Sequence, residues 1–389
     1  MNKRHYKYLF SALLTFAALA AFILFIFNPF GLGPEPHSVL SEHFFSVQAQ
    51  DLSQLELLID GKEAAERTAE LMDGAQASIF IQTYIWKDDQ IGRRTADKLK
   101  TLAKRGIQVT ASKDLLGTFF ELGDILKGKP SPVFTKAGLR GHENIIVKTS
   151  LFDDHDHSKY IIVDGRSVVF GGMNIADEYH TKWHDYMVLI RNDRWTEAFE
   201  KRVLRGEPWP DSVPFVIAVN DRRATEIRTA YIQMFDNAKE RIIIEHAYFS
   251  DDKIIAALER AAKKGIQVDV ILPKAPDTHI YPNMITMNRL IGIQSKNNIN
   301  IFLYPRMSHA KVAMVDGVLA AVGSANLTPR SMITTREVTL FVHGKPNDLF
   351  IRRLRKQLSA DIAESEKVVQ PFQLGFPEKV LALAGKYIW

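Results

Sequence analysis

Alternating hydrophobic and polar positions predict a layered α/β fold. Apolar residues recur at helical spacing over Thr95 to Arg105 and again over Ile254 to Lys264. A strand-like apolar run follows each helix, at Ile107 to Ala111 and at Ile266 to Leu272. Strands that alternate with helices in this way form βαβ units, which give sheets covered by helices.

The same pattern occurs twice along the chain. The strand-like run Ile79-Phe80-Ile81 is matched by Ile242-Ile243-Ile244, and a pair of aspartates follows each run, Asp88-Asp89 and Asp251-Asp252. A repeat this long indicates a duplicated domain rather than a solenoid of short units. At 389 residues, the chain is also long enough for two domains.

Stretches rich in proline, glycine and polar residues set the expected domain boundaries. One runs from Gly31 to Leu55 and another from Gly206 to Pro214. We therefore expect the following division of the chain: a linker over 28–58, a first domain over 59–205, an interdomain linker over 206–220, a second domain over 221–365 and a C-terminal tail over 366–389.

The N-terminal end predicts a membrane anchor. Residues 8–27 form an apolar run that only Ser11 and Thr15 interrupt, and this run is long enough to cross a bilayer as one transmembrane helix. Three cations lie in the short tail of residues 1–7, and the next one is Lys62. The positive-inside rule then predicts a single-pass cell-membrane protein with a cytoplasmic N-terminus and the rest of the chain outside, periplasmic or extracellular. A cleaved signal peptide is the alternative.

The C-terminal tail is apolar as well. Between Pro371 and Trp389 it combines aromatic and aliphatic residues with Lys379 and Lys386. Such a segment fits a short helix that lies at a membrane surface. It fits equally well a helix that caps the core of the second domain.

Composition and charge narrow the class of protein. The chain is 46% hydrophobic and 24% charged, which is typical of a globular protein, and its net charge is +5. Residues 29–389 contain 47 basic and 45 acidic side chains, so this part of the chain lacks the basic excess of a strong nucleic-acid binder. The absence of cysteine excludes disulfides, thiol catalysis and zinc–thiolate sites.

One polar pattern occurs once in each half. Its order is His-x-Lys, four residues, Asp, six residues, and then Gly, Gly or Ser, any residue and Asn. Eleven residues after the Asn, each copy has a carboxylate. The first copy comprises His157, Lys159, Asp164, Gly171, Gly172, Asn174 and Asp185, and the second comprises His309, Lys311, Asp316, Gly323, Ser324, Asn326 and Glu337.

These residue types suit the binding of a tetrahedral phosphate. Lysine supplies positive charge, asparagine and serine donate hydrogen bonds, and tight glycine turns expose backbone N–H groups. We expect the phosphate contacts to come from Lys159, Lys311, Asn174, Asn326, Gly172 and Ser324.

The paired histidines suit transfer of a phosphoryl-type group. A neutral imidazole attacks phosphorus and forms a covalent intermediate, while a protonated imidazole delivers a proton to the leaving oxygen. The ordinary imidazole pKa of about 6.5 serves both tasks. A carboxylate behind each ring would fix its tautomer and support its positive charge, and Asp185 and Glu337 are the candidates. The run Asp153 to His157 has metal-ligand residue types, but no second ligand cluster completes it, so we expect neither metal nor cofactor.

The two motif copies resemble the paired HKD motifs of the phospholipase D superfamily, over roughly residues 60 to 365. The resemblance implies two pseudo-twofold-related α/β domains, each a mixed β-sheet flanked by helices, whose motifs meet in one active site without a metal. It also implies that His157 is the nucleophile, that His309 is the acid and then the base, and that Asp164 and Asp316 are structural.

The flanking residues are similar to those of bacterial cardiolipin synthases, notably the segments Thr83 to Trp86, Gly171 to Tyr179, Trp183 to Asp185, Gly323 to Met332 and Arg336 to Val338. This similarity implies transfer of a phosphatidyl group from phosphatidylglycerol to a second lipid alcohol at a membrane, without nucleic acid, by a chain that suffices as a monomer. Members of the superfamily that use water instead, phospholipase D-type hydrolases and exported nucleases or phosphodiesterases, are the alternative. The intact His/Lys pairs argue against an inactive binding protein.

Overall fold

The computed structural model describes residues 36–150, 155–221, 223–294 and 298–388. The predicted cytoplasmic tail and transmembrane segment, residues 1–7 and 8–27, lie outside these ranges. Among the helices that the structure describes, none is both long enough and apolar enough to cross a bilayer.

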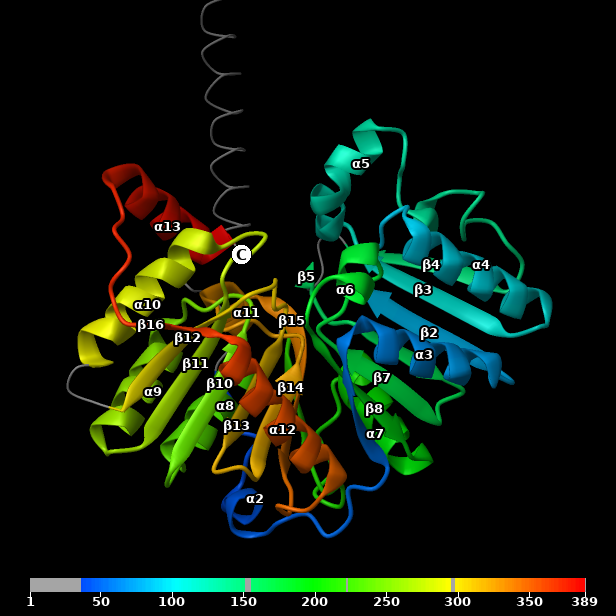
Figure 1. Ribbon diagram of the computed structural model, residues 1–389. Helices are drawn as coiled ribbons and strands as arrows, with labels where there is room; N and C mark the ends of the chain where they lie inside the picture. Colours follow the sequence, from blue (N-terminus) through cyan, green and yellow to red (C-terminus); the bar gives the residue numbers. More distant parts are fainter. Residues whose placement is uncertain (1–35, 151–154, 222, 295–297, 389) are drawn as a thin grey trace, which may run out of the picture.

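The first half of the chain forms a seven-stranded mixed sheet (Figure 1). Its neighbouring strands run antiparallel from β1 to β2 and parallel from β2 to β4. The order across the sheet is β1 (Leu55–Ile59), β8 (Tyr186–Arg191), β7 (Ser167–Gly171), β6 (Tyr160–Val163), β2 (Ser78–Thr83), β3 (Gln108–Asp114) and β4 (Ile145–Ser150).

The second half repeats this order and these strand directions, which confirms the predicted duplication of an α/β domain. The second sheet also carries two additional strands, β16 (Glu366–Val368) beyond β12 and, from the first half of the chain, the two-residue β5 (His155–Asp156) beside β15. The repeated order is β9 (Val216–Asn220), β15 (Thr335–His343), β14 (Leu319–Gly323), β13 (Lys311–Val315), β10 (Arg241–His246), β11 (Gln267–Pro273) and β12 (Ile299–Tyr304).

Helices flank both sheets, and some of them occupy equivalent places in the two halves. Thus α4 and α9 each connect two parallel strands, as the predicted βαβ units require. The helices are α2 (Glu42–Ser46), α3 (Asp60–Asp73), α4 (Gln90–Lys104), α5 (Leu122–Leu126), α6 (Asp177–Thr181), α7 (Asp193–Arg205), α8 (Ile227–Asp236), α9 (Asp252–Lys263), α10 (Ile280–Gln294), α11 (Pro329–Ile333), α12 (Leu349–Glu364) and α13 (Phe376–Ile388), with short 3₁₀ turns η1 (Leu116–Glu121) and η2 (Pro132–Phe134).

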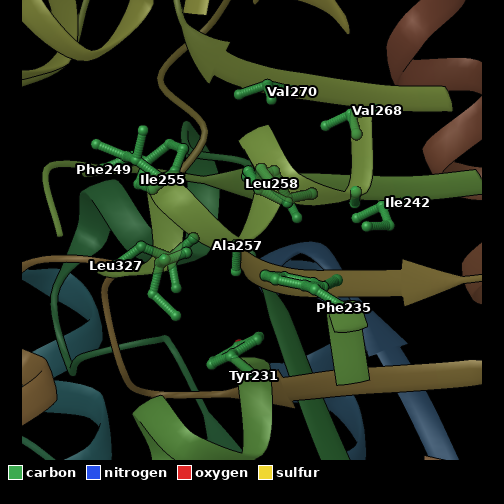
Figure 2. Close-up of a cluster of buried hydrophobic side chains, with 14 of the residues drawn as sticks. Tyr231, Phe235, Ile242, Phe249, Ile255, Ala257, Leu258, Val268, Val270 and Leu327 are labelled. Carbon is green, nitrogen blue, oxygen red and sulfur yellow. The ribbon is translucent and has the colours of Figure 1, made fainter. Parts of the chain in front are cut away.

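A shared hydrophobic core joins the two halves. Val188 of β8 belongs to the same buried cluster as Val322 of β14 and Leu340 of β15. On the outer face of the second sheet, α8 and α9 cover β10 and β11, and Figure 2 shows Tyr231 and Leu258 among the side chains of that layer. The sheets therefore pack on one another, and this packing fixes the two motif copies relative to each other.

Strands lie within the segments that the sequence analysis assigned to linkers. The segment assigned to the first linker ends in β1, and the segment assigned to the interdomain linker ends in β9. Each is the first strand of its half and pairs antiparallel with β8 or β15. The C-terminal tail likewise begins with β16. These strands are three to five residues long, which is too short for a clear hydrophobic alternation in the sequence.

The repeated aspartate pairs explain where the paired helices begin. Asp89 accepts a hydrogen bond from the backbone N–H of Gly92, and Asp251 accepts bonds from Lys253 and Ile254. Both are therefore N-caps. Because of these caps, α4 starts five residues before the predicted position and α9 starts two residues before it.

The motif aspartates act within the fold. Asp164 accepts hydrogen bonds of 2.8 Å from the backbone N–H groups of residues 76–78, and Asp316 accepts bonds of 2.9 Å from those of residues 239–241. Each lies in a hairpin turn with a positive φ, 55° and 52°. Each aspartate thus ties the hairpin after its motif to the start of a central strand, β2 or β10.

We predict that Asp164→Ala lowers the free energy of unfolding by about 2–4 kcal/mol, because three N–H groups lose a charged acceptor. Burial opposes ionisation of Asp164, but its three N–H bonds outweigh burial and lower its pKa below the usual 3.8. The stabilisation is therefore fully present above that pH and is lost as the pH falls below it. Chemical denaturation measures the difference. Asp97→Ala, on the exposed face of α4, is the control, and an equal effect from both substitutions would contradict the assignment.

Candidate active site

The two motif histidines line one cavity between the halves. His157, Asn174 and Tyr84 come from the first half, and His309 and Asn326 come from the second. The cavity has a volume of about 70 Å³. Since a cavity needs roughly 10–15 Å³ to hold one water molecule, this space accepts a phosphate-sized group but not a whole phospholipid. Its other lining residues are Ile85, Phe120, Tyr179, Tyr248, Asp277, Thr278, Arg330, Ser331 and Thr335.

Backbone pairing across the interface holds His157. The short strand β5 runs parallel to β15 of the other half, with His155 opposite Thr335 and Asp156 opposite Arg336. The N–H of His157 then donates to the carbonyl of Arg336 at 2.9 Å. The first histidine is thus positioned by a strand of the second domain.

Backbone hydrogen bonds across the interface also hold His309. Residues 184 and 308 form a parallel bridge between the halves. The N–H of His184 donates to the carbonyl of Met307 at 3.0 Å, and the N–H of His309 donates to the carbonyl of His184 at 2.7 Å. The second histidine is thus positioned by a segment of the first domain, which completes the pseudo-twofold arrangement.

The carboxylates behind the rings are exchanged between the halves. Nδ1 of His157 lies 2.9 Å from Oε1 of Glu337, and Nδ1 of His309 lies 2.8 Å from Oδ2 of Asp185. Glu337, Asp185 and His309 are buried, whereas the side chain of His157 is 16% exposed. With Nδ1 engaged by a carboxylate, Nε2 of each ring is the nitrogen that remains for chemistry. Neither motif histidine pairs with a carboxylate of its own half.

Different surroundings support the two carboxylates. Glu337 accepts hydrogen bonds from Ser324 at 2.6 Å and from Ser331 at 2.8 Å. Asp185 accepts one from the backbone N–H of Tyr186 at 2.8 Å. A Cβ atom on Gly172 would lie 2.3 Å from Oδ1 of Asp185, so only glycine fits there. Gly172 and Ser324, predicted to bind phosphate, therefore contact the carboxylates and are not on the cavity wall.

The motif lysines are also set back from the cavity. Lys159 is 2% exposed and Lys311 is 1% exposed, and each ammonium is hydrogen-bonded to the carbonyl of its own motif histidine. Nζ of Lys311 also lies 2.9 Å from Nδ1 of His309. The lysines thus supply positive charge from behind the rings, and neither is among the residues that line the cavity.

The pKa values follow from burial and from this charge. Burial, aided by Lys159, lowers the pKa of His157 to about 4, and burial with Lys311 lowers that of His309 well below its usual value. Burial opposes ionisation of Glu337, but the contact with His157 outweighs it and lowers the pKa. Burial raises the pKa of Asp185 to about 7. Both rings are therefore neutral near pH 7, and that of His157 lies beside the ionised Glu337.

The lysine pKa values fall as well. Burial lowers the pKa of Lys159 to about 7 and that of Lys311 to about 8, although the nearby carboxylates Glu337 and Asp185 oppose this by raising both pKa values. A bound anion favours the charged forms of lysine and histidine. Arrival of a phosphate group would thus raise the histidine pKa values toward the range in which one ring can donate a proton.

Aromatic residues of the cavity wall pack against the rings of both motif histidines. The ring of Tyr84 lies 4.8 Å from that of His157, and the ring of Tyr179 lies 5.0 Å from that of His309. Tyr248, Tyr179, Phe120 and Asp277 were not among the predicted site residues. Tyr179 ends the Gly171 to Tyr179 segment noted in the sequence, but nothing in its spacing distinguished a cavity wall from core packing.

The motif asparagines lie on the cavity wall with different partners. Oδ1 of Asn174 accepts a hydrogen bond from the N–H of Ile85 at 2.9 Å. Oδ1 of Asn326 is buried and has no hydrogen-bond partner among the described residues. Asn326 is therefore the better placed of the two for a new contact with a substrate hydroxyl.

One buried acidic cluster adjoins the site. His184, Glu245 and Asp361 lie close enough for a metal ion by spacing alone. However, Nδ1 of His184 lies 2.6 Å from Asp60, its Nε2 lies 3.0 Å from the hydroxyl of Tyr186, and Glu245 accepts from Ser308. These groups satisfy one another as a hydrogen-bonded network behind the bridge that holds His309.

A duplicated α/β fold, with one His–Lys motif from each half beside a single cavity, defines a phospholipase D superfamily enzyme. The family described as "Cardiolipin synthase, PLD-like domain" matches residues 69–205 and 231–362. These matches cover more than half of the chain, so it belongs to this family.

Known relatives agree with that placement. The chain is 28% identical over 325 residues to the major cardiolipin synthase ClsA of Bacillus subtilis, covering 75% of this chain and 66% of that protein. Cardiolipin synthase 2 of Bacillus anthracis is 27% identical, with 80% and 65% covered. Cardiolipin synthase B of Salmonella typhimurium is 26% identical, with 83% of each covered. The chain thus spans slightly less than two thirds of the first two relatives.

The fold has a solved counterpart. The crystal structure of phosphatidylserine synthase from Haemophilus influenzae matches with a TM-score of 0.66 at 15% identity, covering 87% of this chain and 95% of that one. At this identity the likeness establishes the shared fold.

We predict that sulfate, whose charge is constant near neutral pH, binds the cavity and that its affinity falls as the pH rises. The fall should begin near 7 and steepen above 8, because Lys159 and Lys311 lose their protons at about those values. Titration calorimetry on Lys159→Met should show weaker binding and a shallower pH dependence. Lys98→Met, which removes a surface lysine, controls for net charge. A pH-independent affinity would contradict the cationic site.

Proposed function

We propose that the protein is a membrane-anchored phosphatidyltransferase of the cardiolipin synthase type. The observation that supports this most directly is the crossed pair of hydrogen bonds, His157–Glu337 and His309–Asp185, beside one phosphate-sized cavity. The family match, one copy in each half, and the cardiolipin synthase relatives favour a lipid substrate. Phosphatidylglycerol is the proposed donor.

The first step is attack on the donor by His157. Its Nε2 forms a bond to phosphorus while Nδ1–H is held by the ionised Glu337, which stabilises the positive charge that develops on the ring. The bond from phosphorus to the glycerol oxygen breaks. Nε2 of His309, protonated in the presence of the anionic substrate, gives its proton to that oxygen, and glycerol leaves.

The second step returns the phosphatidyl group to a lipid alcohol. The hydroxyl of the acceptor lipid gives its proton to the now neutral Nε2 of His309 and bonds to phosphorus. The bond from phosphorus to Nε2 of His157 breaks, and both histidines regain their starting forms. Lys159 and Lys311 offset the charge on the phosphate oxygens in both steps.

The choice of acceptor depends on keeping water from the intermediate. Tyr84, Tyr179 and Tyr248 surround the histidines and are themselves less than a tenth exposed. A cavity with such walls admits a hydroxyl group from a lipid that is already held at its opening more readily than bulk water. We propose that the catalytic body faces the outer side of a cell membrane, with residues 8–27 as its anchor.

We predict that the purified full chain converts phosphatidylglycerol vesicles into cardiolipin and free glycerol. Because each histidine is needed in both steps, His157→Ala and His309→Ala should each abolish turnover. Thin-layer chromatography of the lipids and an enzymatic glycerol assay identify the products. His43→Ala, on α2, is the control and should leave turnover intact.

Two outcomes would contradict the proposal. Phosphatidic acid as the main product would indicate a phospholipase D-type hydrolase. No lipid turnover, together with cleavage of single-stranded DNA, would indicate an exported nuclease. A phosphatidyl adduct trapped on the His157→Ala variant would contradict the nucleophile assignment alone.

A further inference from the structure

The cavity is too small for most of a phospholipid molecule. Its volume of about 70 Å³ holds the phosphate, so the acyl chains of a bound lipid stay outside the protein. The surface around the opening then decides whether those chains remain in a bilayer. Two segments carry exposed apolar side chains near this opening. One begins at the cavity wall, and the other packs on a helix that begins beside the wall.

The first segment is η1 followed by α5. Phe120 lines the cavity, and its ring lies 5.8 Å from that of Tyr84. The residues around it point outward: Phe119 is 62% exposed, Leu122 is 50% exposed and Leu126 is 79% exposed. Apolar side chains therefore continue from the wall of the cavity to the tip of α5.

The base of this segment is firmly attached. Glu121 is 1% exposed, accepts a hydrogen bond of 2.8 Å from the N–H of Trp86 and lies 3.2 Å from Nζ of Lys113. A buried ion pair of this kind fixes the start of α5 and sets its direction. The exposure of Phe119, Leu122 and Leu126 is thus a property of the fold at this point.

The second segment is α13. It packs on α10, which begins two residues after Thr278 of the cavity wall. Ala382 is 2% exposed, and a Cβ atom on Gly385 would lie 3.1 Å from Pro282, so small residues bring α13 close to α10. The opposite face is open to solvent and apolar, with Phe376 81%, Val380 50%, Leu381 55% and Leu383 65% exposed.

Both segments lie at the same end of the molecule. In Figure 1, α5 and α13 stand on either side of the region where β5, α6 and α11 meet, and α2 lies at the opposite end. Lysines accompany the apolar side chains: Lys127 and Lys129 follow α5, and Lys379 lies on α13, all exposed. Apolar side chains flanked by lysines are the composition of surfaces that enter the interface of an anionic bilayer.

We propose that η1–α5 and α13 together form a bilayer-contact surface that holds the opening of the cavity against a membrane of anionic phospholipids. This proposal rests on the proposed function for its choice of a lipid occupant. Interfacial helices bury their apolar face about 5–10 Å into the boundary between headgroups and acyl chains. At that depth, a lipid phosphate reaches the cavity between the two segments while its chains stay in the bilayer.

The absence of cysteine makes this surface directly measurable. Single substitutions Leu126→Cys and Leu383→Cys in the full chain place an environment-sensitive fluorophore on α5 or on α13. Leu349→Cys is the matched control, because Leu349 is a 59% exposed leucine at the start of α12, on a helix that does not adjoin the cavity. Each labelled protein is reconstituted into phosphatidylglycerol–phosphatidylcholine vesicles that carry a quencher on the acyl chains.

We expect the acyl-chain quencher to reduce the fluorescence at positions 126 and 383 several-fold and to leave position 349 little changed. Quenching at positions 126 and 383 that is no greater than at 349 would overturn the proposal. Burial of either label in detergent without lipid, together with a dimeric mass by light scattering, would also overturn it and would assign the surface to a second copy of the chain.

The contribution of the lysine charges to bilayer binding can be measured separately. Lys127→Gln with Lys129→Gln should reduce quenching at position 126 in phosphatidylglycerol vesicles and have little effect in pure phosphatidylcholine. An equal loss in both kinds of vesicle would contradict a role for charge. Quenching requires no turnover, so its result stands whether or not cardiolipin forms, and failure of the bilayer contact is distinguishable from failure of the proposed reaction.

Discussion

The active site depends on two hydrogen bonds that cross the boundary between the halves. Each pairs the imidazole of one domain with the carboxylate of the other, His157 with Glu337 and His309 with Asp185. Separating the halves would break both hydrogen bonds and expose the rings and carboxylates to water. The shared core around Val188 and Val322 and the strand pairing of β5 with β15 keep these bonds in place. Stability of the domain interface and chemistry at phosphorus thus rest on the same contacts.

Each half of the duplicated fold supplies one histidine and one carboxylate, but the two His–carboxylate pairs are not equivalent. Glu337 has hydrogen bonds from two serine hydroxyls and a lowered pKa, whereas burial raises that of Asp185 to about 7. A firmly ionised carboxylate suits the ring that becomes positively charged on attack. A carboxylate that titrates near neutrality suits the ring that exchanges a proton twice per cycle. We propose that this difference suits His157 to act as nucleophile and His309 to act as acid and base.

The sequence predicted the duplicated α/β fold and the residues of both motifs, because a repeat and its polar pattern are visible without coordinates. It did not predict the first strand of each half, since β1 and β9 are short and follow polar segments. It placed Gly172 and Ser324 at phosphate, whereas they pack against the carboxylates, and it missed Tyr179 and Tyr248. Spacing along the chain reveals neither which side of a turn faces a cavity nor that each carboxylate pairs with a histidine of the other half.

The exchange of partners is best tested with a phosphodiester that has a p-nitrophenolate leaving group, which departs without a proton. The rate of the first p-nitrophenolate release, measured by stopped flow, should fall about 100-fold or more in Glu337→Gln, because His157 loses its orienting carboxylate. The same rate should change little in Asp185→Asn, because the proton that His309 supplies is no longer needed. The opposite pattern, a normal release in Glu337→Gln and a slow one in Asp185→Asn, would contradict the crossed assignment.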